Sequence, residues 1–298
     1  MNFRELMIRS NGLEFSALEA GVRGAPVCIC VHGFPDYART WRFLLPVLAN
    51  AGYYAIAPYT RGYTPSSIPA NGSYHASTLA KDILGIIDAL GEEQAILIGH
   101  DWGADAVYGA SILAPERVRL LVTLGGPHPI NTLALSNYDQ LKRFWYSFYF
   151  LTPEAELVVK ADNFAFLDRL WIDWSPSYRL SPEEAQALKA IFNTPGVLTA
   201  ALGYYRCLTD QSNPDKNLIN EAHRVLTESI PVETLYIHGE DNGCIGVNLL
   251  DSMDKAYIGG LHKRIIPGAG HFVHLESPDV VNALILEFIQ SRFSHQLS

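Results

Sequence analysis

The sequence predicts an α/β fold in which a mostly parallel, eight-stranded sheet carries helices on both faces and a helical segment is inserted. Three observations predict this class. In the first half of the 298-residue chain, apolar runs typical of buried strands alternate with helical patterns, the alternation stops near residue 130, and it resumes after residue 226. With 48% hydrophobic and 18% charged residues, the chain has the composition of a compact globular protein.

The predicted elements begin with a hairpin. Residues 7–8 and 13–18 flank Asn11-Gly12, a pair that favours a tight turn between antiparallel strands. Further strands are predicted at residues 27–31, 53–57, 95–98, 120–124, 233–238 and 264–266, and helices at residues 79–90 and 280–293. Strands that are separated by helices usually pair in parallel, so these segments should share one sheet, with the site beyond the carboxyl ends of its strands.

The middle of the chain has a different character. Residues 144–151 read FWYSFYFL, and the segment from residue 130 to 226 is aromatic, helical and interrupted by prolines. We therefore expect a first core part at residues 1–129, a helical lid inserted at residues 130–226, and a second core part at residues 227–298.

Charge and cysteine content limit the partners and the compartment. A net charge of −9 and a pI near 5.5 argue against nucleic acid and against an anionic membrane surface as partners. Cys28, Cys30, Cys207 and Cys244 show neither disulfide-like nor zinc-like spacing, so we expect free thiols and no metal. The N-terminus lacks an apolar signal region and no apolar run approaches the ~20 residues that span a bilayer. A cytoplasmic protein, monomeric or homodimeric, is expected.

The stretch AILIGHDWGA, residues 95–104, predicts a buried strand, a sharp turn at Asp101 and a helix rich in small residues. This is the pattern of a nucleophile elbow with an aspartate in place of serine, in which Gly99 and Gly103 allow close approach of backbones. An aspartate is already ionised at neutral pH and can attack an sp³ carbon directly. The alternative is that Asp101 only caps the following helix.

Three further loops follow predicted strands and complete a possible site. His32-Gly33-Phe34-Pro35 follows the strand at 27–31, and the N–H groups of Phe34 and Trp102 could stabilise an oxyanion. Residues 239–243 and 268–271 follow two later strands, and the second of these loops ends in His271. Five other histidines lack a loop framed by glycines like that of His271 and are interpreted as structural: His32, His100, His128, His238 and His274.

The motifs HGFPD, GHDWGA and GAGHFVHLESP resemble those of epoxide hydrolases and haloalkane dehalogenases in the α/β-hydrolase superfamily. The resemblance covers the whole chain and implies the α/β-hydrolase fold without a cofactor. It also implies that Asp101 attacks carbon to form an ester, which water activated by His271 then hydrolyses.

The leaving group distinguishes the two branches. An epoxide leaves as an alkoxide, which needs an acid, and the lid offers Tyr146 and Tyr205, which are similar to lid tyrosines of epoxide hydrolases; Tyr149 or Tyr204 are the alternatives. A halide needs only N–H donors, and Phe34 stands where many dehalogenases carry Asn. A small apolar epoxide is therefore the preferred substrate, and a halogenated one the alternative.

Two other functions are considered, one enzymatic and one without catalysis. Haloacetate dehalogenases bind a carboxylate through arginines just after the nucleophile, where this chain has Trp102 and Asp105, so that branch is disfavoured. A non-catalytic receptor for small ligands on the same fold remains an alternative.

The acid of the expected triad departs from the family pattern. The family usually carries Asp in G-x-x-D after the strand that ends near His238, but here the fourth residue from Gly239 is Asn242, preceded by Asp241. Either Asp241 shifts to meet His271, or Asn242 orients the imidazole through its amide oxygen.

Overall fold

A computed structural model describes residues 3–128, 137–210, 213–251 and 253–293 of the chain. Its eight strands form one sheet in the order β1-β2-β4-β3-β5-β6-β7-β8. The strands are β1 (Arg4–Ser10), β2 (Leu13–Ala20), β3 (Val27–Val31), β4 (Tyr54–Pro58), β5 (Ala95–His100), β6 (Val118–Leu124), β7 (Thr234–Gly239) and β8 (Leu261–Ile266). Only the β1–β2 and β2–β4 pairs are antiparallel, which confirms the predicted eight-stranded, mostly parallel sheet.

The described α-helices are α1 (Leu44–Asn50), α2 (Ala76–Ala89), α3 (Trp102–Leu113), α5 (Tyr138–Arg143), α6 (Trp145–Tyr149), α7 (Ala155–Trp174), α8 (Pro182–Asn193), α9 (Val197–Thr209), α10 (Lys216–Thr227), α11 (Val273–Glu276) and α12 (Pro278–Phe293). Short 3₁₀ helices lie at Ala38–Phe43, Pro115–Arg117, Val247–Leu250 and Met253–Ala256. None of the helices in these residue ranges is long and apolar enough to cross a membrane.

Local sequence explains the first and most buried strands. Asn11 and Gly12 both adopt positive φ, as the tight turn between β1 and β2 requires, and Ser10 pairs with Leu13 across it. In β3, every residue is buried, because Val27, Ile29 and Val31 enter the core on one face while Cys28 and Cys30 enter the core on the other. All four cysteines are free thiols.

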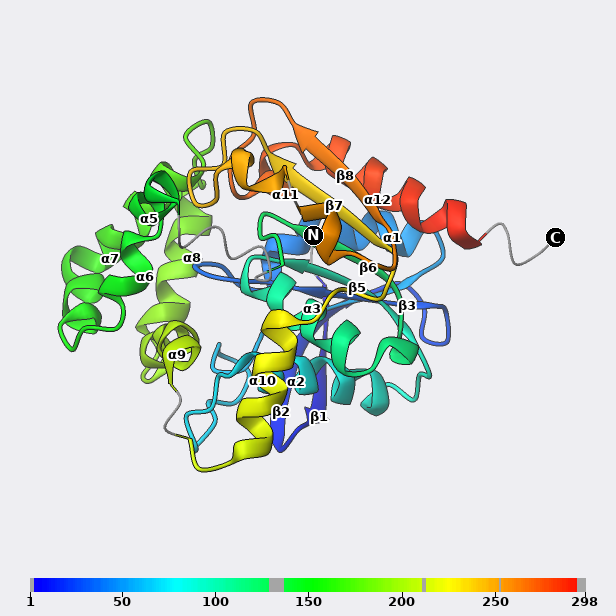
Figure 1. Ribbon diagram of the computed structural model, residues 1–298, viewed down its shortest axis with the longest axis horizontal. Helices are drawn as coiled ribbons and strands as arrows, with labels where there is room; N and C mark the ends of the chain where they lie inside the picture. Colours follow the sequence, from blue (N-terminus) through cyan, green and yellow to red (C-terminus); the bar gives the residue numbers. More distant parts are fainter. Residues whose placement is uncertain (1–2, 129–136, 211–212, 252, 294–298) are drawn as a thin grey trace.

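Helices cover both faces of the sheet, and a separate group of helices stands at one side (Figure 1). On one face α2 packs on α3, and on the other α1 packs on α12. Helices α5 to α9, green in Figure 1, gather beside the sheet, whereas α10 packs against α2 and α3. The predicted lid begins at residue 130, outside the described residues; the described helices α5 to α9 are called the lid.

Candidate active site

Asp101 stands between β5 and α3 in a backbone conformation that few residues adopt. Its φ of 53° and ψ of −124° make a sharp turn, and strain of this kind is typical of functional sites. A Cβ on Gly99 would lie 2.3 Å from the Gly103 carbonyl oxygen, and one on Gly103 would lie 2.1 Å from the Val31 carbonyl oxygen, so both positions require glycine. The Asp101 side chain makes no capping hydrogen bond to α3. This geometry favours the elbow over the helix cap.

One oxygen of the Asp101 carboxylate is held by the loop after β3. The backbone N–H of Phe34 donates a hydrogen bond of 2.8 Å to Asp101 Oδ1. Gly33 makes this approach possible, because a Cβ there would lie 2.3 Å from Oδ1 and 2.7 Å from the backbone nitrogen of Trp102. The two N–H groups that the sequence suggested for an oxyanion therefore lie next to the carboxylate.

His271 lies against the other carboxylate oxygen. Its Nε2 atom is 3.3 Å from Asp101 Oδ2, and its side chain is completely buried. Burial alone would raise the pKa of Asp101, but the His271 imidazole and the Phe34 N–H outweigh burial, and the net pKa lies below its ordinary value. At neutral pH the Asp101 carboxylate is therefore ionised and in contact with the imidazole.

The remaining motif histidines have structural partners. His100 Nε2 donates to the His271 carbonyl oxygen over 3.0 Å, and His32 accepts from the backbone N–H of Thr60 over 3.0 Å. Burial lowers the pKa of His100 to about 3 and that of His32 to about 4, so both are neutral at pH 7. The other histidines interpreted as structural are likewise buried and bonded: His128 to Val225, His238 to Tyr236 and Ile245, and His274 to Thr40.

The expected acid does not reach His271. The Oδ1 atom of Asn242 accepts hydrogen bonds of 2.9 Å from the backbone N–H groups of both Cys244 and Ile245, and Nδ2 donates to the Gly125 carbonyl oxygen over 3.4 Å. The amide oxygen is thus occupied in its own loop and does not orient the imidazole.

Asp241, the other candidate, is exposed. Its backbone N–H donates to the Ala269 carbonyl oxygen over 2.9 Å, whereas its side chain makes no hydrogen bond to His271 among the residues that the structure describes. In the described part of the chain, the Nδ1 atom of His271 has no hydrogen-bond partner. The described contacts therefore do not support the expectation that Asp241 or Asn242 orients His271. Asp241 is exposed to solvent, and the amide oxygen of Asn242 already accepts two backbone hydrogen bonds.

The C-terminal end of α7 joins the loops that follow β7 and β8. The Trp174 carbonyl oxygen accepts from the backbone N–H groups of both His271 and Gly243, over 2.9 and 3.0 Å. Glu276, in the HFVHLESP motif, accepts from the Ser175 hydroxyl over 2.6 Å and from the Gly270 N–H over 2.9 Å. The sequence motif contained Glu276, but only the fold shows that it joins the His271 loop to the lid.

The lid places two of the four candidate tyrosines near the carboxylate. Tyr146 and Tyr205 are buried, their ring centroids lie 5.9 Å apart, and the Tyr205 ring meets Trp102 edge-on at 5.0 Å. Burial raises the pKa of both hydroxyls well above the usual value, and the charge of Asp101 raises it further. Both hydroxyls therefore keep their protons and can donate them.

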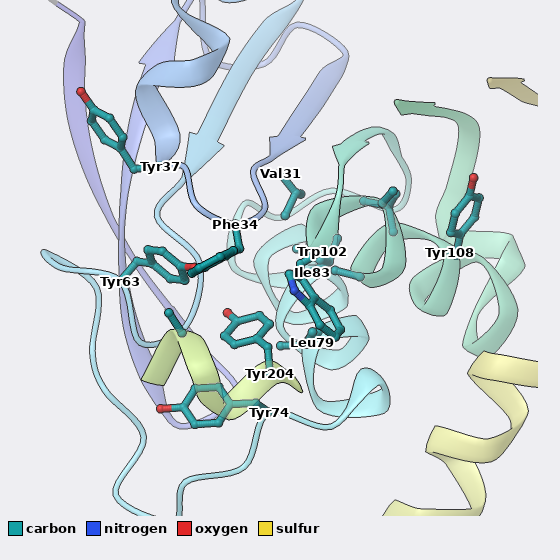
Figure 2. Packing of buried hydrophobic residues seen from close by; sticks show 14 of the residues in the cluster. Val31, Phe34, Tyr37, Tyr63, Tyr74, Leu79, Ile83, Trp102, Tyr108 and Tyr204 are labelled. Carbon is teal, nitrogen blue, oxygen red and sulfur yellow. The ribbon is translucent and has the colours of Figure 1, made fainter. Parts of the chain in front are cut away.

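The alternative tyrosines are placed differently. The hydroxyl of Tyr204 donates to the Arg61 carbonyl oxygen over 2.8 Å, and Figure 2 shows its ring among Trp102, Tyr63 and Tyr74. Tyr149 is only partly buried and stacks on another lid side chain, Phe166, rather than on core residues of the site.

Cys244 is a site residue that the sequence did not reveal. Its thiol is buried, its Sγ atom lies 3.2 Å from the Tyr146 hydroxyl, and ligand atoms of Cys244, Asp101 and His271 lie within 4.8 Å of one another. No motif or spacing marks this cysteine, because its neighbours come from β5, the β8 loop and the lid.

The strand order, the turn at Asp101 and the buried histidine define the class of protein. Residues 26–278 match the model of the alpha/beta hydrolase fold family, and the chain belongs to this family and is a hydrolase. Its relatives include epoxide hydrolase A of Mycobacterium tuberculosis, 31% identical over 96% of this chain and 97% of that protein. Human epoxide hydrolase 4 is 30% identical over 95% of this chain and 77% of that protein.

A solved structure agrees with these relatives. The crystal structure of epoxide hydrolase A from Mycobacterium thermoresistibile is similar to this chain with a TM-score of 0.84 and 28% identity, covering 97% of this chain and 98% of that one.

Proposed function

We propose that this hydrolase opens small apolar epoxides to vicinal diols through a covalent ester on Asp101. The observation that carries the proposal is the position of two buried tyrosines at the nucleophile turn: the Tyr205 ring meets Trp102 at 5.0 Å, and the Tyr146 hydroxyl lies 3.2 Å from the Sγ atom of Cys244. Their raised pKa values agree with a role as acids. An alkoxide leaving group needs such donors, whereas a halide does not. The names of the relatives agree with this substrate class.

In the first step, Asp101 Oδ2 attacks an epoxide carbon, the carbon–oxygen bond of the ring breaks, and Tyr146 or Tyr205 donates its proton to the leaving oxygen. The aromatic surroundings favour an apolar substrate, since the Phe34 ring contacts both Tyr205 and Phe150. Because the hydroxyls hold their protons up to high pH, ring opening has its acid available throughout the physiological range.

In the second step, His271 takes a proton from water, and the resulting hydroxide attacks the ester carbonyl carbon of Asp101. The negative charge then develops on the carbonyl oxygen, next to the Phe34 N–H that already donates to Asp101 Oδ1. The tetrahedral intermediate then collapses, the ester carbon–oxygen bond breaks, and the leaving diol oxygen takes the proton that remains on the added hydroxyl group, which restores the carboxylate. The imidazolium of His271 returns its proton to the tyrosinate by way of solvent, so that both side chains are ready for the next turnover.

Halogenated substrates are the second candidate. Asp101 and His271 would serve both reactions, but the Phe34 side chain packs among aromatic rings and offers no side-chain N–H to a halide. We therefore expect bromide release to be much slower than diol formation. The structure likewise gives no reason to prefer a non-catalytic receptor, because the carboxylate and its N–H donor are in contact.

Incubation of the protein with a styrene-oxide-like epoxide and, separately, with a bromoalkane tests the proposal. Diol from the first supports it, bromide from the second would support the dehalogenase, and neither product would support the receptor. Intact-mass and peptide analysis of the His271→Gln variant should then show one substrate adduct on the peptide that carries Asp101. An unmodified peptide, although the parent turns over the same epoxide, would refute the covalent step.

A further inference from the structure

The reaction centre contains three side chains of the kinds that bind zinc. Ligand atoms of Asp101, Cys244 and His271 lie within 4.8 Å of one another, and the carboxylate and imidazole atoms are already 3.3 Å apart. At ordinary bond lengths, a tetrahedral zinc ion sets oxygen, nitrogen and sulfur ligands roughly 3.3–3.6 Å apart. Cys244 Sγ therefore has to approach the other two ligand atoms by at most roughly 1.5 Å to complete the geometry.

Burial and missing partners make this set unusual. His271 is 0% exposed, and neither of its ring nitrogens has a hydrogen-bond partner of good geometry among the described residues. Cys244 is 1% exposed and its thiol contacts the Tyr146 hydroxyl. A buried imidazole whose only polar side-chain contact within the described ranges is the Asp101 carboxylate at 3.3 Å, with a thiol close by, is an arrangement that a cation would stabilise.

We propose that Asp101, Cys244 and His271 form a binding site for a thiophilic divalent cation of the Zn²⁺ class, and that the bound ion inhibits the enzyme. On binding, the S–H bond of Cys244 breaks, its electron pair forms the sulfur–metal bond and the proton passes to solvent. The predicted inhibition rests on the proposed function, because the ion would bind the carboxylate that attacks the epoxide and the imidazole that activates water. Binding of the ion does not depend on the proposed function.

Charge and surroundings support this site. A divalent ion with one carboxylate and one thiolate has no net charge, so its burial avoids a large desolvation cost. The Tyr146 hydroxyl, 3.2 Å from Sγ, can donate to the thiolate and strengthen the site as a second layer of hydrogen bonding. The Asp101 side chain keeps 12% of its surface exposed, which leaves the site in contact with solvent.

A second cluster provides a comparison. Asp36, His100 and His274 also offer ligand atoms within 4.8 Å of one another, but none of these residues is more than 3% exposed. A divalent ion there would keep one net positive charge in a closed interior, and it would have no thiolate ligand. The two clusters can therefore be distinguished by spectroscopy.

The binding experiment uses Co²⁺ as a probe for Zn²⁺. Titration of the metal-free full chain should give one ion per chain and a thiolate-to-cobalt charge-transfer band in the near ultraviolet, which Zn²⁺ removes by competition. In Cys244→Ala the band should be lost and the affinity should fall by more than about tenfold, because one of three ligands is missing. Cys207→Ala, which removes the partly exposed cysteine of α9, is the matched control. It should keep the charge-transfer band and the affinity for Co²⁺.

Inhibition is measured separately. Zn²⁺ should inhibit epoxide turnover reversibly and in competition with substrate. The turnover that Cys244→Ala retains, measured with and without Zn²⁺, should resist the ion by the same factor. A cobalt spectrum without a thiolate band in the parent would overturn the proposal and indicate a site without cysteine, such as the inner cluster. A thiolate band that Cys244→Ala leaves unchanged would overturn it too, because the ligand would then be another cysteine. If no epoxide is turned over, the proposed function fails, while the cobalt band still decides whether the site exists.

Discussion

Replacing Asn242 by Asp should speed the second half of the reaction selectively. Asn242 lies in the acid loop, where its Oδ1 accepts two backbone N–H groups and its Nδ2 reaches the Gly125 carbonyl oxygen. A carboxylate can keep both N–H bonds through one oxygen. Its second oxygen is repelled by the Gly125 carbonyl oxygen, to which the amide nitrogen now donates over 3.4 Å. We expect the carboxylate to turn from there toward the unpartnered Nδ1 atom of His271 and to accept a hydrogen bond from it.

The size of the effect follows from the bond that is gained. His271 becomes an imidazolium when it activates water, and a hydrogen bond to a charged group contributes about 1.5–3 kcal/mol. Since 1.36 kcal/mol corresponds to a factor of ten in rate, ester breakdown should become about 10- to 100-fold faster. Ester formation by Asp101 does not require the imidazolium and should stay within about twofold.

Rapid-quench measurement of ester formation and breakdown in single turnovers tests this. The parent should accumulate ester in the steady state, and Asn242→Asp should not. The matched control is Asp241→Asn, which changes an exposed neighbour and should alter neither step. If Asn242→Asp leaves breakdown unchanged, or if Asp241→Asn abolishes it, the assignment of this loop position is wrong.

Other parts of the site give further expectations. Tyr146→Phe and Tyr205→Phe should each slow ester formation with an epoxide about 100-fold, as loss of a general acid does, but slow it little with an alkyl bromide; equal losses would mark both as packing residues. Gly33→Ala should reduce the rate of ester formation at least about 100-fold, because a Cβ there would displace the Asp101 carboxylate. Gly126→Ala is the control and should behave like the parent, because its Cβ would lie no closer than 3.7 Å to any neighbouring atom. The pKa of Asp101 is lowered and the pKa values of Tyr146 and Tyr205 are raised, so the rate of ester formation should not change with pH between about pH 5 and pH 9. A pH–rate profile in which this rate falls to half its maximum near pH 6 would contradict this.

The sequence by itself determined the sheet and the position of Asp101 at a sharp turn after a buried strand. Buried strands such as 27–31 and 95–98 are continuous apolar runs, and the turn at Asp101 is framed by glycines that have to be there for steric reasons. Strands with weaker patterns were predicted less completely. β8 begins at Leu261 rather than at residue 264, because His262 and Lys263 are polar and the first three residues are only half-buried at the edge of the sheet.

Only the tertiary structure decided which side chains meet. Tyr146 and Tyr204 belong to similar aromatic segments of the lid, but the first contacts the acid loop at Cys244 and the second bonds to Arg61, and no local pattern distinguishes them. No local pattern shows either that the amide oxygen of Asn242 accepts hydrogen bonds from the backbone of its own loop and so does not contact His271. Local patterns fix an element and its buried face, whereas partners across the site depend on how distant loops pack together.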